Sequence, residues 1–518
     1  MKHYGKQFGL SEGYGIFRFM LVALLALANV TFTITIIAAL TFFASFAEMA
    51  IAFIALFVVL RMTVRLRSPD YTLAWAIIML FVPAAGLVLY FSWGRVSFSR
   101  NERGSLERSA RMGREFFENE DCHIDGLCRE HPHLTRQAKI LRASGFPVYR
   151  GGEVEYLPLG ESLFERMISD LEAAEDFILM SYYIIAPGEL WDRIHGILAE
   201  KVKKGVTVRV MYDDFGCVKS VGRGFAESLR AEGMEAAVFN PIHRYVRQLY
   251  FYYRNHQKIC VVDGKCAYLG GANIADEYIN RRQRLGHWKD TGVRITGGGV
   301  RSVTVTFLQM WDMAARTGVS DYGRFTEKTP GAEDSGCRMI PFAGGPLYRP
   351  LTPAHDIYET MCETARNEVW YATPYLAPDS TLREAFCLAA RGGVDIRIVT
   401  PAIPDHVTVF AATRGNYQRL LDAGVRIFEY TPGFMHAKMI VCDRSSAVVG
   451  SINIDTGSFH RQYENAVWFT GSPEVDKIAA DFENIFVWCK EIKREEWMKR
   501  PLTQRFWEAS MCLMSPLF

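Results

Sequence analysis

The sequence lacks a cysteine framework. Its 518 residues include 11 cysteines, an odd number, which are widely scattered and form no Cys-x-x-Cys pair. Small secreted domains that depend on disulfides carry dense, paired cysteines, so this pattern argues against that class. One stretch contains Cys122, His123, Cys128, His131 and His133. It lacks the ligand spacing of a known zinc site, and we interpret it as part of a polar linker that holds no metal.

The sequence also lacks a strong charge of either sign. The formal net charge is +2, which gives no general bias toward nucleic acid. Hydrophobic residues make up 49% of the chain and charged residues 22%, which suits a globular body with a small membrane part. The length predicts two or three domains.

Two long apolar runs occupy residues 1–96, where we expect a membrane anchor of two to three helices. The first run extends from Phe19 to Leu60 and contains one charged residue, Glu48. It is about twice the ~20 residues that one crossing needs, so we expect two helices that turn near Ala44–Glu48. It is too long for a signal peptide. The second run, Tyr71–Phe91, contains Pro83.

Arginines flank the second run on both sides. The group before it is Arg61, Arg65 and Arg67, and the group after it is Arg95, Arg100, Arg103, Arg108, Arg111 and Arg114. The positive-inside rule places both groups on the cytoplasmic side, which a single crossing between them cannot satisfy. Either the second run is a re-entrant or interfacial hairpin, or the rule is violated. We expect a multi-pass protein whose remaining domains are cytoplasmic.

Beyond a charged linker, predicted for residues 97–148, β-rich runs alternate with helical stretches. Phe177–Ile185 is typical of a strand, Leu190–Lys204 has helical spacing, and Val206–Tyr212 is again typical of a strand. This alternation predicts an α/β layered fold.

A repeat decides the domain organisation. Residues 256–274 read HQKICVVDGKCAYLGGANI, and residues 436–454 read HAKMIVCDRSSAVVGSINI. They align without a gap and predict two copies of one domain, at 149–330 and 331–518, related by a pseudo-twofold axis. The matched pairs are His256 and His436, Lys258 and Lys438, Asp263 and Asp443, Gly270 and Gly450, and Asn273 and Asn453.

The repeated His-x-Lys element suits phosphodiester chemistry. In a strand the two side chains lie on one face, so two facing sets give two imidazoles and two ammoniums. One imidazole can attack phosphorus, and the other can act as general acid and then base. The lysines stabilise charge on the non-bridging oxygens without a metal or cofactor. We expect Asn273, Asn453 and Ser451 to donate hydrogen bonds to those oxygens.

Carboxylates have two expected places. Each imidazole needs a partner that fixes its tautomer. Candidates downstream of the motifs are Asp290 and Glu464, with Glu277 as the alternative in the first half. For Asp263 and Asp443 two roles stay open, direct chemistry or bracing of the turn that follows each strand.

At these residues the chain resembles the phospholipase D superfamily, which is marked by a duplicated HKD motif, and within it the bacterial cardiolipin synthases. The resemblance implies two tandem phospholipase D-like α/β sandwich domains behind N-terminal transmembrane helices. It covers most of the chain and is carried by Arg67–Pro69, Leu73–Trp75, Gly94–Arg95, Arg254–Gly264, His287–Asp290, Ala372–Asp379, Gly433–Asp443 and the pair Glu464-Asn465. The sequence departs from the family at Ala186–Glu189 and in the turn Arg444–Ser446.

The resemblance implies phosphatidyl transfer between two phosphatidylglycerol molecules, which gives cardiolipin and glycerol through a phosphohistidine. It assigns His256 as nucleophile and His436 as acid. It implies the bacterial inner membrane as location, phosphatidylglycerol and other anionic phospholipids as partners, and no nucleic acid. The alternatives are another phosphatidyl transfer or lipid hydrolysis, a membrane-tethered nuclease, and a non-catalytic lipid-binding scaffold.

Two further segments have open roles. His243–Asn255 is rich in basic and aromatic residues. We expect it to contact membrane or substrate, with packing beside the site as the alternative. The C-terminal tail Trp507–Phe518 is apolar and either docks on the body or touches the bilayer.

Overall fold

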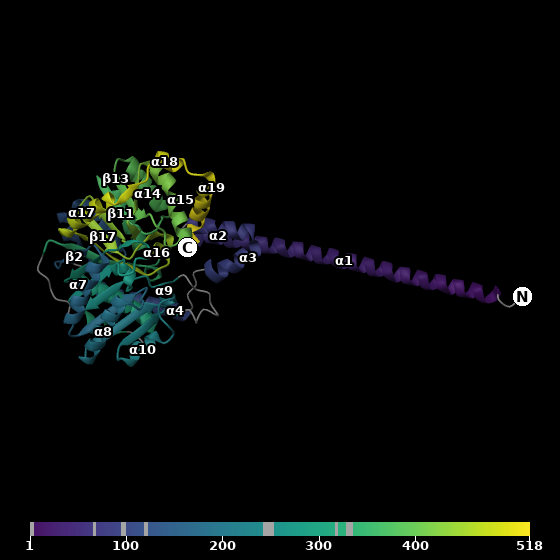
Figure 1. Ribbon diagram of the computed structural model, residues 1–518, viewed down its shortest axis with the longest axis horizontal. Coiled ribbons are helices and arrows are strands. Elements are labelled where there is room, and N and C mark those ends of the chain that lie inside the picture. The colour runs from purple at the N-terminus through teal and green to yellow at the C-terminus, as the bar shows by residue number, and fades with distance from the viewer. Residues whose placement is uncertain are drawn as a thin grey trace. The chain divides into compact units, whose positions relative to one another are not determined.

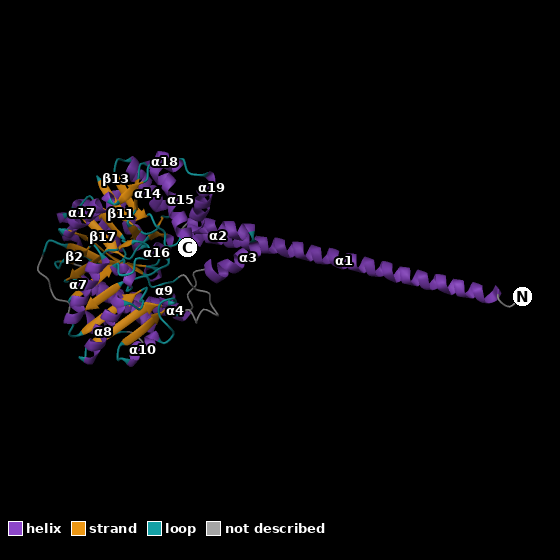
Figure 2. Cartoon of the chain, viewed as in Figure 1, coloured by secondary structure: helices purple, strands orange, loops and turns teal. Residues whose placement is uncertain are grey.

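A computed structural model describes residues 5–65, 69–94, 100–118, 123–241, 253–315, 320–327 and 335–517. They divide into two compact units, Met1–Gly94 and Arg95–Phe518, each taken by itself below. The first unit is helical, and the second is a mixed α/β body (Figures 1 and 2). Most of the basic and aromatic segment at 243–255 lies outside the described residues.

The first apolar run forms one continuous helix, α1 (Gly5–Arg65), so the predicted turn near Ala44–Glu48 is wrong. No glycine or proline interrupts the chain from Ile16 to Arg65, and nothing breaks the helix there. Met20–Val64 is the one described helix that is long and apolar enough to cross a membrane. Its 45 residues extend about 68 Å, more than one crossing needs.

Hydroxyl groups within α1 are satisfied along the helix. Each of four threonine side chains donates to the carbonyl four residues earlier, at 2.8–2.9 Å. In hydrocarbon an unpaired polar group costs several kcal/mol, so this pairing suits a lipid environment. The four are Thr31, Thr33, Thr35 and Thr41.

The second apolar run is a helical hairpin. It consists of α2 (Pro69–Phe81), α3 (Pro83–Leu89) and a π-helical turn at Tyr90–Gly94. Pro83 supplies no N–H and restricts the residue before it, which breaks the helix at Val82. The Tyr71 hydroxyl donates to the Gly94 carbonyl at 2.6 Å. The two ends of the run therefore meet, which is the hairpin arrangement.

The segment predicted to be a charged linker differs from that expectation. It contains α4 (Arg100–Glu118), α5 (Ile124–Glu130) and α6 (Thr135–Ala143). Helix α4 contacts α11 (Gly299–Ala315), and α6 contacts α13 (Pro353–Thr364). Phe117, Leu127 and Leu141 are buried in the core. The charged side chains line the outer faces of amphipathic helices, so high charge here does not indicate a free linker.

Two sheets form the body, and they repeat the same strand order. The first sheet is β2 (Val154–Leu157), β9 (Gly292–Thr296), β7 (Cys266–Gly270), β6 (Ile259–Val262), β3 (Phe177–Tyr182), β4 (Thr207–Asp213) and β5 (Glu235–Phe239). The second is β1 (Tyr149–Arg150), β10 (Arg338–Gly344), β19 (Glu464–Thr470), β17 (Ser446–Gly450), β16 (Met439–Cys442), β11 (Glu368–Ala372), β13 (Asp395–Pro401), β14 (Arg426–Tyr430) and β20 (Cys489–Glu491).

The order β9-β7-β6-β3-β4-β5 recurs as β19-β17-β16-β11-β13-β14. The chain therefore contains two phospholipase D-like repeats. One detail differs from the expected boundaries: Tyr149–Arg150 pairs with β10 of the second sheet rather than with the first. The expected boundary at 330/331 falls within residues 328–334, outside the described ranges.

Helices and short elements complete both halves. In the first half they are α7 (Gly160–Ala173), α8 (Glu189–Lys203), α9 (Asp214–Cys217), α10 (Phe225–Ala231), β8 (His287–Lys289) and α12 (Tyr322–Thr326). In the second they are β12 (Leu376–Ala377), α14 (Ser380–Arg391), α15 (Val407–Ala423), β15 (Gly433–Met435), β18 (Ile454–Asp455), α16 (Thr456–His460), α17 (Glu474–Val487), α18 (Arg494–Met498), α19 (Leu502–Met514) and η6 (Ser515–Leu517).

Strand periodicity divides the core in two. Phe177 and Leu179 of β3 point into a core shared with strands of the second sheet. Ile178 and Met180 point the other way and pack with residues of α7 and α8. Because the period of a strand is two, each central strand of the first half faces both cores. The shared core holds the two halves together.

Candidate active site

The two motif histidines are each held by the backbone of the opposite half. The His256 N–H donates to the Tyr463 carbonyl at 2.9 Å, and the His436 N–H donates to the Lys289 carbonyl at 2.8 Å. The second bond continues the parallel pairing of β15 with β8. These exchanges bring the His-x-Lys set of each half to the other half.

The carboxylates cross over as well. Glu464, from the second half, lies 2.9 Å from His256 Nδ1. Asp290, from the first half, lies 2.6 Å from His436 Nδ1. Both carboxylates are fully buried. A carboxylate at Nδ1 fixes the proton on that nitrogen and leaves Nε2 for chemistry.

The downstream candidates Asp290 and Glu464 thus both lie beside an imidazole, but each partners the histidine of the other repeat. The alternative Glu277 lies 3.5 Å from Arg282 instead. Sequence order pairs each carboxylate with the preceding motif, and this exchange between halves is visible only in three dimensions.

Ser451 orients a carboxylate and does not have the role expected of it. Its hydroxyl donates to Glu464, and it accepts from the Asn465 N–H at 3.0 Å. The aligned residue of the first half is Gly271, where an added Cβ would lie 2.3 Å from Asp290 Oδ1. The two halves are therefore chemically unequal. The longer Glu464 is braced by a serine, whereas the shorter Asp290 needs the space left by a glycine.

The two asparagines also differ. Asn273 accepts from the Ile184 N–H at 3.0 Å and donates to the Tyr278 hydroxyl at 2.7 Å. Its polar atoms are thus engaged within the first half. Asn453 is buried, and its Oδ1 has no hydrogen-bond partner among the described residues. Of the pair, Asn453 retains an acceptor for a bound molecule.

Asp263 lies in the turn between β6 and β7 and braces it. Asp263 and Gly264 have positive φ, 53° and 66°, as a two-residue type I′ turn requires. Burial raises the pKa of Asp263, but backbone N–H donors outweigh this and lower the pKa. Its carboxylate accepts from the N–H groups of Glu175, Asp176 and Phe177 at 2.8–2.9 Å.

Asp443 has the same arrangement in the second half. Its carboxylate accepts from three consecutive backbone N–H groups at 2.8–3.0 Å, and its turn partner Arg444 also has positive φ. For both aspartates the structure corrects the catalytic assignment, because their oxygens are used in bracing the fold. The donors to Asp443 are Arg366, Asn367 and Glu368.

The two motif lysines are buried beside the imidazoles. Lys258 Nζ donates to the His256 carbonyl at 2.6 Å, and Lys438 Nζ lies 2.8 Å from His436 Nδ1. Asn465 accepts from the Lys258 N–H at 3.0 Å. The pairs Glu464-Asn465 and His256-x-Lys258 are therefore bonded to each other across the halves.

Burial governs the protonation of the site. It lowers the pKa of His256 well below its usual range, and the Lys258 and Lys438 ammoniums lower it further. Burial likewise lowers the pKa of His436 to about 4. Both imidazoles are therefore neutral at pH 7, as a nucleophile must be.

The same burial acts on the charged neighbours. It lowers the pKa of Lys258 to about 7 and of Lys438 to about 8, and it raises the pKa of Glu464 to about 8. A bound phosphodiester anion stabilises the cationic forms and raises the pKa of the lysines and imidazoles again. The site thus gains protons when substrate binds.

Aromatic rings enclose both imidazoles, which the sequence analysis missed. The Tyr183 ring lies 4.9 Å from the His256 ring, and the Tyr278 and Trp288 rings lie 5.3 and 5.5 Å from that of His436. The signal available was the aromatic content next to the motifs. Such walls exclude water and strengthen the electrostatic interactions within.

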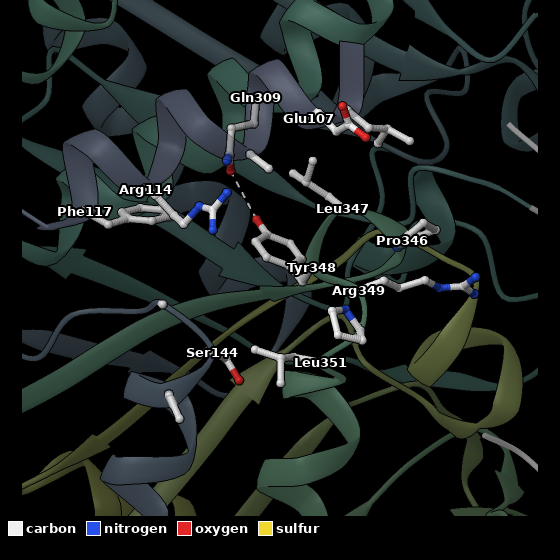
Figure 3. A pocket seen from close by; sticks show the side chains of 15 residues that line it. Glu107, Arg114, Phe117, Ser144, Gln309, Pro346, Leu347, Tyr348, Arg349 and Leu351 are labelled. Atoms are coloured by element: carbon white, nitrogen blue, oxygen red, sulfur yellow. Dashed lines mark hydrogen bonds between the residues drawn. The ribbon is translucent and has the colours of Figure 1, made fainter. Parts of the chain in front are cut away.

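A separate cavity of about 650 Å³ lies between α4, α11 and residues 346–351. Figure 3 shows the side chains that line it, with Tyr348 bonded to Gln309. None of the motif residues lines it. It is therefore distinct from the paired histidines.

Family models match both repeats and the anchor. The model described as "Cardiolipin synthase, PLD-like domain" matches residues 167–290 and again 358–486. The model described as "Phospholipase_D-nuclease N-terminal" matches residues 50–95. A protein of Bacillus cereus named cardiolipin synthase 2 is 33% identical over 87% of this chain and 87% of its own length.

The chain belongs to the phospholipase D-like cardiolipin synthase family. Another member, a cardiolipin synthase of Geobacillus kaustophilus, is 32% identical over 89% of this chain and 92% of its own length. An uncharacterised Streptococcus mutans protein is 36% identical over 86% and 96%. As a member of this family the chain is an enzyme, a phosphatidyltransferase of the phospholipase D superfamily. With α1, it is a membrane protein.

A solved structure shares the fold of this cardiolipin synthase family member. Phosphatidylserine synthase of Haemophilus influenzae superposes with a TM-score of 0.57 at 14% identity, over 74% of this chain and 99% of that one. At this identity the likeness concerns the fold alone.

The crossed carboxylates lead to a first prediction. Glu464→Gln should lower turnover about 10³–10⁴-fold, because the His256 tautomer is no longer fixed. Asp290→Asn should lower it similarly through His436. A thermal unfolding scan should show both variants folded. Near-normal turnover in steady-state lipid assays with either variant would contradict the orienting role.

The bracing aspartates lead to a second prediction. Asp263→Ala should destabilise the protein by roughly 1–3 kcal/mol, because backbone donors lose their acceptor. Turnover per folded molecule should stay close to that of the wild type. Asp443→Ala is the matched variant of the second half. Unchanged stability in denaturant unfolding, together with collapsed turnover, would restore a direct chemical role.

Proposed function

We propose that this enzyme synthesises cardiolipin by transferring a phosphatidyl group from one phosphatidylglycerol to another, with release of glycerol. The observation that supports it best is the buried pair of imidazoles, each with a carboxylate from the opposite half and a lysine of its own. Relatives that carry this name cover most of the chain. The proposal requires no metal or cofactor.

In the first step we assign His256 as nucleophile. Its neutral Nε2 attacks phosphorus while Glu464 stabilises the charge that develops on the ring. The bond from phosphorus to the glycerol headgroup oxygen breaks. His436, protonated in the presence of the bound anion, donates its proton to that oxygen, and glycerol leaves.

In the second step the chemistry runs in reverse with another alcohol. The now neutral His436 takes the proton of a headgroup hydroxyl of the second phosphatidylglycerol. The hydroxyl oxygen forms a bond to phosphorus, the phosphorus–nitrogen bond to His256 breaks, and cardiolipin leaves. Lys258 and Lys438 stabilise the non-bridging oxygens throughout. Asn453 is the asparagine with an acceptor to spare for a hydroxyl of either lipid.

We also propose a topology. Helix α1 crosses the bilayer, and the hairpin of α2 and α3 enters and leaves on one side. Because Tyr71 and Gly94 meet at its ends, the arginine groups before and after it can both face the cytoplasm, as the positive-inside rule asks. The catalytic unit is then cytoplasmic, on the bacterial inner membrane. Only α1 among the described helices has crossing length, so the expected multi-pass arrangement reduces to one crossing.

The topology predicts the result of reporter fusions. Green fluorescent protein joined to Phe518 should fluoresce, and alkaline phosphatase at the same position should be inactive, because the C-terminus is cytoplasmic. The same reporters placed before Met1 should give the opposite pattern. An active phosphatase at Phe518 would overturn the orientation.

The reaction predicts the products from a single lipid. Purified enzyme with headgroup-labelled phosphatidylglycerol should yield cardiolipin and free labelled glycerol, without a nucleotide-activated lipid. His256→Ala should lose the products and the covalent phosphatidyl adduct, whereas His436→Ala should still form adduct from a donor whose leaving group needs no proton.

Other outcomes would redirect the assignment. Phosphatidic acid as the only product would indicate a hydrolase or a different acceptor. A trapped adduct on His436 would exchange the roles of the histidines. Cleavage of nucleic acid without lipid turnover would favour a tethered nuclease.

A further inference from the structure

Helix α19 has its apolar face turned outward. Leu502, Phe506 and Leu513 are spaced by four and seven residues, so they form one stripe along the helix. Their exposed fractions are 76%, 77% and 42%, and Trp507 beside them is 46% exposed. A helix that packs on a soluble body normally turns such a stripe inward.

The inner side of α19 is polar and firmly fixed. Glu508 is 3% exposed, accepts from Gln504 at 3.0 Å, and pairs with Arg500. Arg414 of α15 lies 3.4 Å from Glu508. An added Cβ at Gly415 would lie 2.5 Å from the Glu508 carbonyl, so the two helices cross in close contact. Rolling α19 over would expose an ion cluster, so the outward stripe belongs to the native fold.

This outward face continues to the active site. The turn η6 after α19 contacts α16, whose N-cap Asp455 acts electrostatically on Lys438. The segment after β13 carries exposed Val407 and half-buried Ile403. Between them, Asp405 accepts from the Tyr375 hydroxyl at 2.5 Å and also acts on Lys438. Apolar side chains thus lie next to groups that sense the catalytic lysine.

The first half supplies a matching segment after β4, the strand that corresponds to β13 in the repeated order. Helix α9 carries Phe215 and is followed by Val218, both exposed. At Gly216 an added Cβ would lie 2.1 Å from the Tyr183 carbonyl, and the Tyr183 ring contacts His256. Both halves therefore present apolar side chains beside their own part of the site.

The charge of this surface suits anionic lipid. Glu508 is the only carboxylate of α19 and is buried, which leaves Arg505 as the charged group toward the outside. Exposed Lys219 follows Val218. Arginine and lysine beside Trp, Phe and Leu are typical of a helix that lies in the headgroup layer.

We propose that α19, together with the segments 215–218 and 403–407, forms a lipid-facing rim that inserts into the surface of a bilayer rich in anionic lipid and holds the active site at the headgroups. The inference rests on the lipid substrate of the proposed function. It commits to the bilayer as occupant because the rim adjoins the site that a membrane lipid must enter. A second copy of the chain is the competing occupant.

The test uses the full chain and two forms of one substrate. The double variant L502S/F506S is assayed on phosphatidylglycerol in vesicles and on monomeric dihexanoyl phosphatidylglycerol in solution. We expect kcat/KM on vesicles to fall about tenfold or more, because roughly 1.5 kcal/mol or more per apolar side chain is lost. On the monomeric lipid it should not change.

Val487→Ser is the matched control, since Val487 is 79% exposed at the end of α17, which lies on the opposite side of the second half from α19 (Figure 1). It should change neither activity. Hydrogen exchange of residues 502–513 should slow when the wild type moves from phosphatidylcholine to phosphatidylglycerol nanodiscs.

Three results would overturn the rim. One is an equal fall on both substrates, which indicates damage to the site. Another is no fall on either. The third is a dimer in the wild type that dissociates in the double variant. Slowed exchange in an enzyme that turns over neither lipid would instead sink the proposed reaction and leave the rim standing.

Discussion

The carboxylate–imidazole bonds that cross between the halves are the constraint on which the site depends. Glu464 and Asp290 are fully buried, and a buried carboxylate without a partner would cost several kcal/mol. Their partners are histidines of the opposite repeat. The halves must therefore meet in one orientation, and the core shared by the two sheets supplies the apolar burial that holds them there. Geometry, protonation and the cohesion of the halves follow from the same contacts.

Much of this arrangement could be read from the sequence because it is written as local pattern. The repeat at 256–274 and 436–454 predicts two halves, and the structure has the same strand order in both. The residues that failed are those whose role depends on distant chain. Ser451 lies in the motif but its hydroxyl binds Glu464. Asp263 is invisible as a brace until the backbone of Glu175 is placed beside it.

The errors in the N-terminal part have a similar cause. Length alone suggested two helices between Phe19 and Leu60, but without glycine or proline the chain continues as one. Charge alone suggested a linker at 97–148, but amphipathic spacing lets α4 and α6 pack on the body. Composition counts residues, whereas packing depends on which face of a helix they share.

The difference between Gly271 and Ser451 concerns the history of the chain. A single repeat holds only half of each histidine's environment, so a one-repeat ancestor would have needed a second copy of itself, and in such a homodimer both imidazoles would carry the same partner. Joining the copies in one gene removed that identity. Each motif could then mutate alone, so one histidine came to sit against a serine-braced glutamate and the other against an aspartate lodged beside a glycine. Duplication with fusion thus turned a symmetric pair into two specialised reagents, one step that only covalent linkage permits.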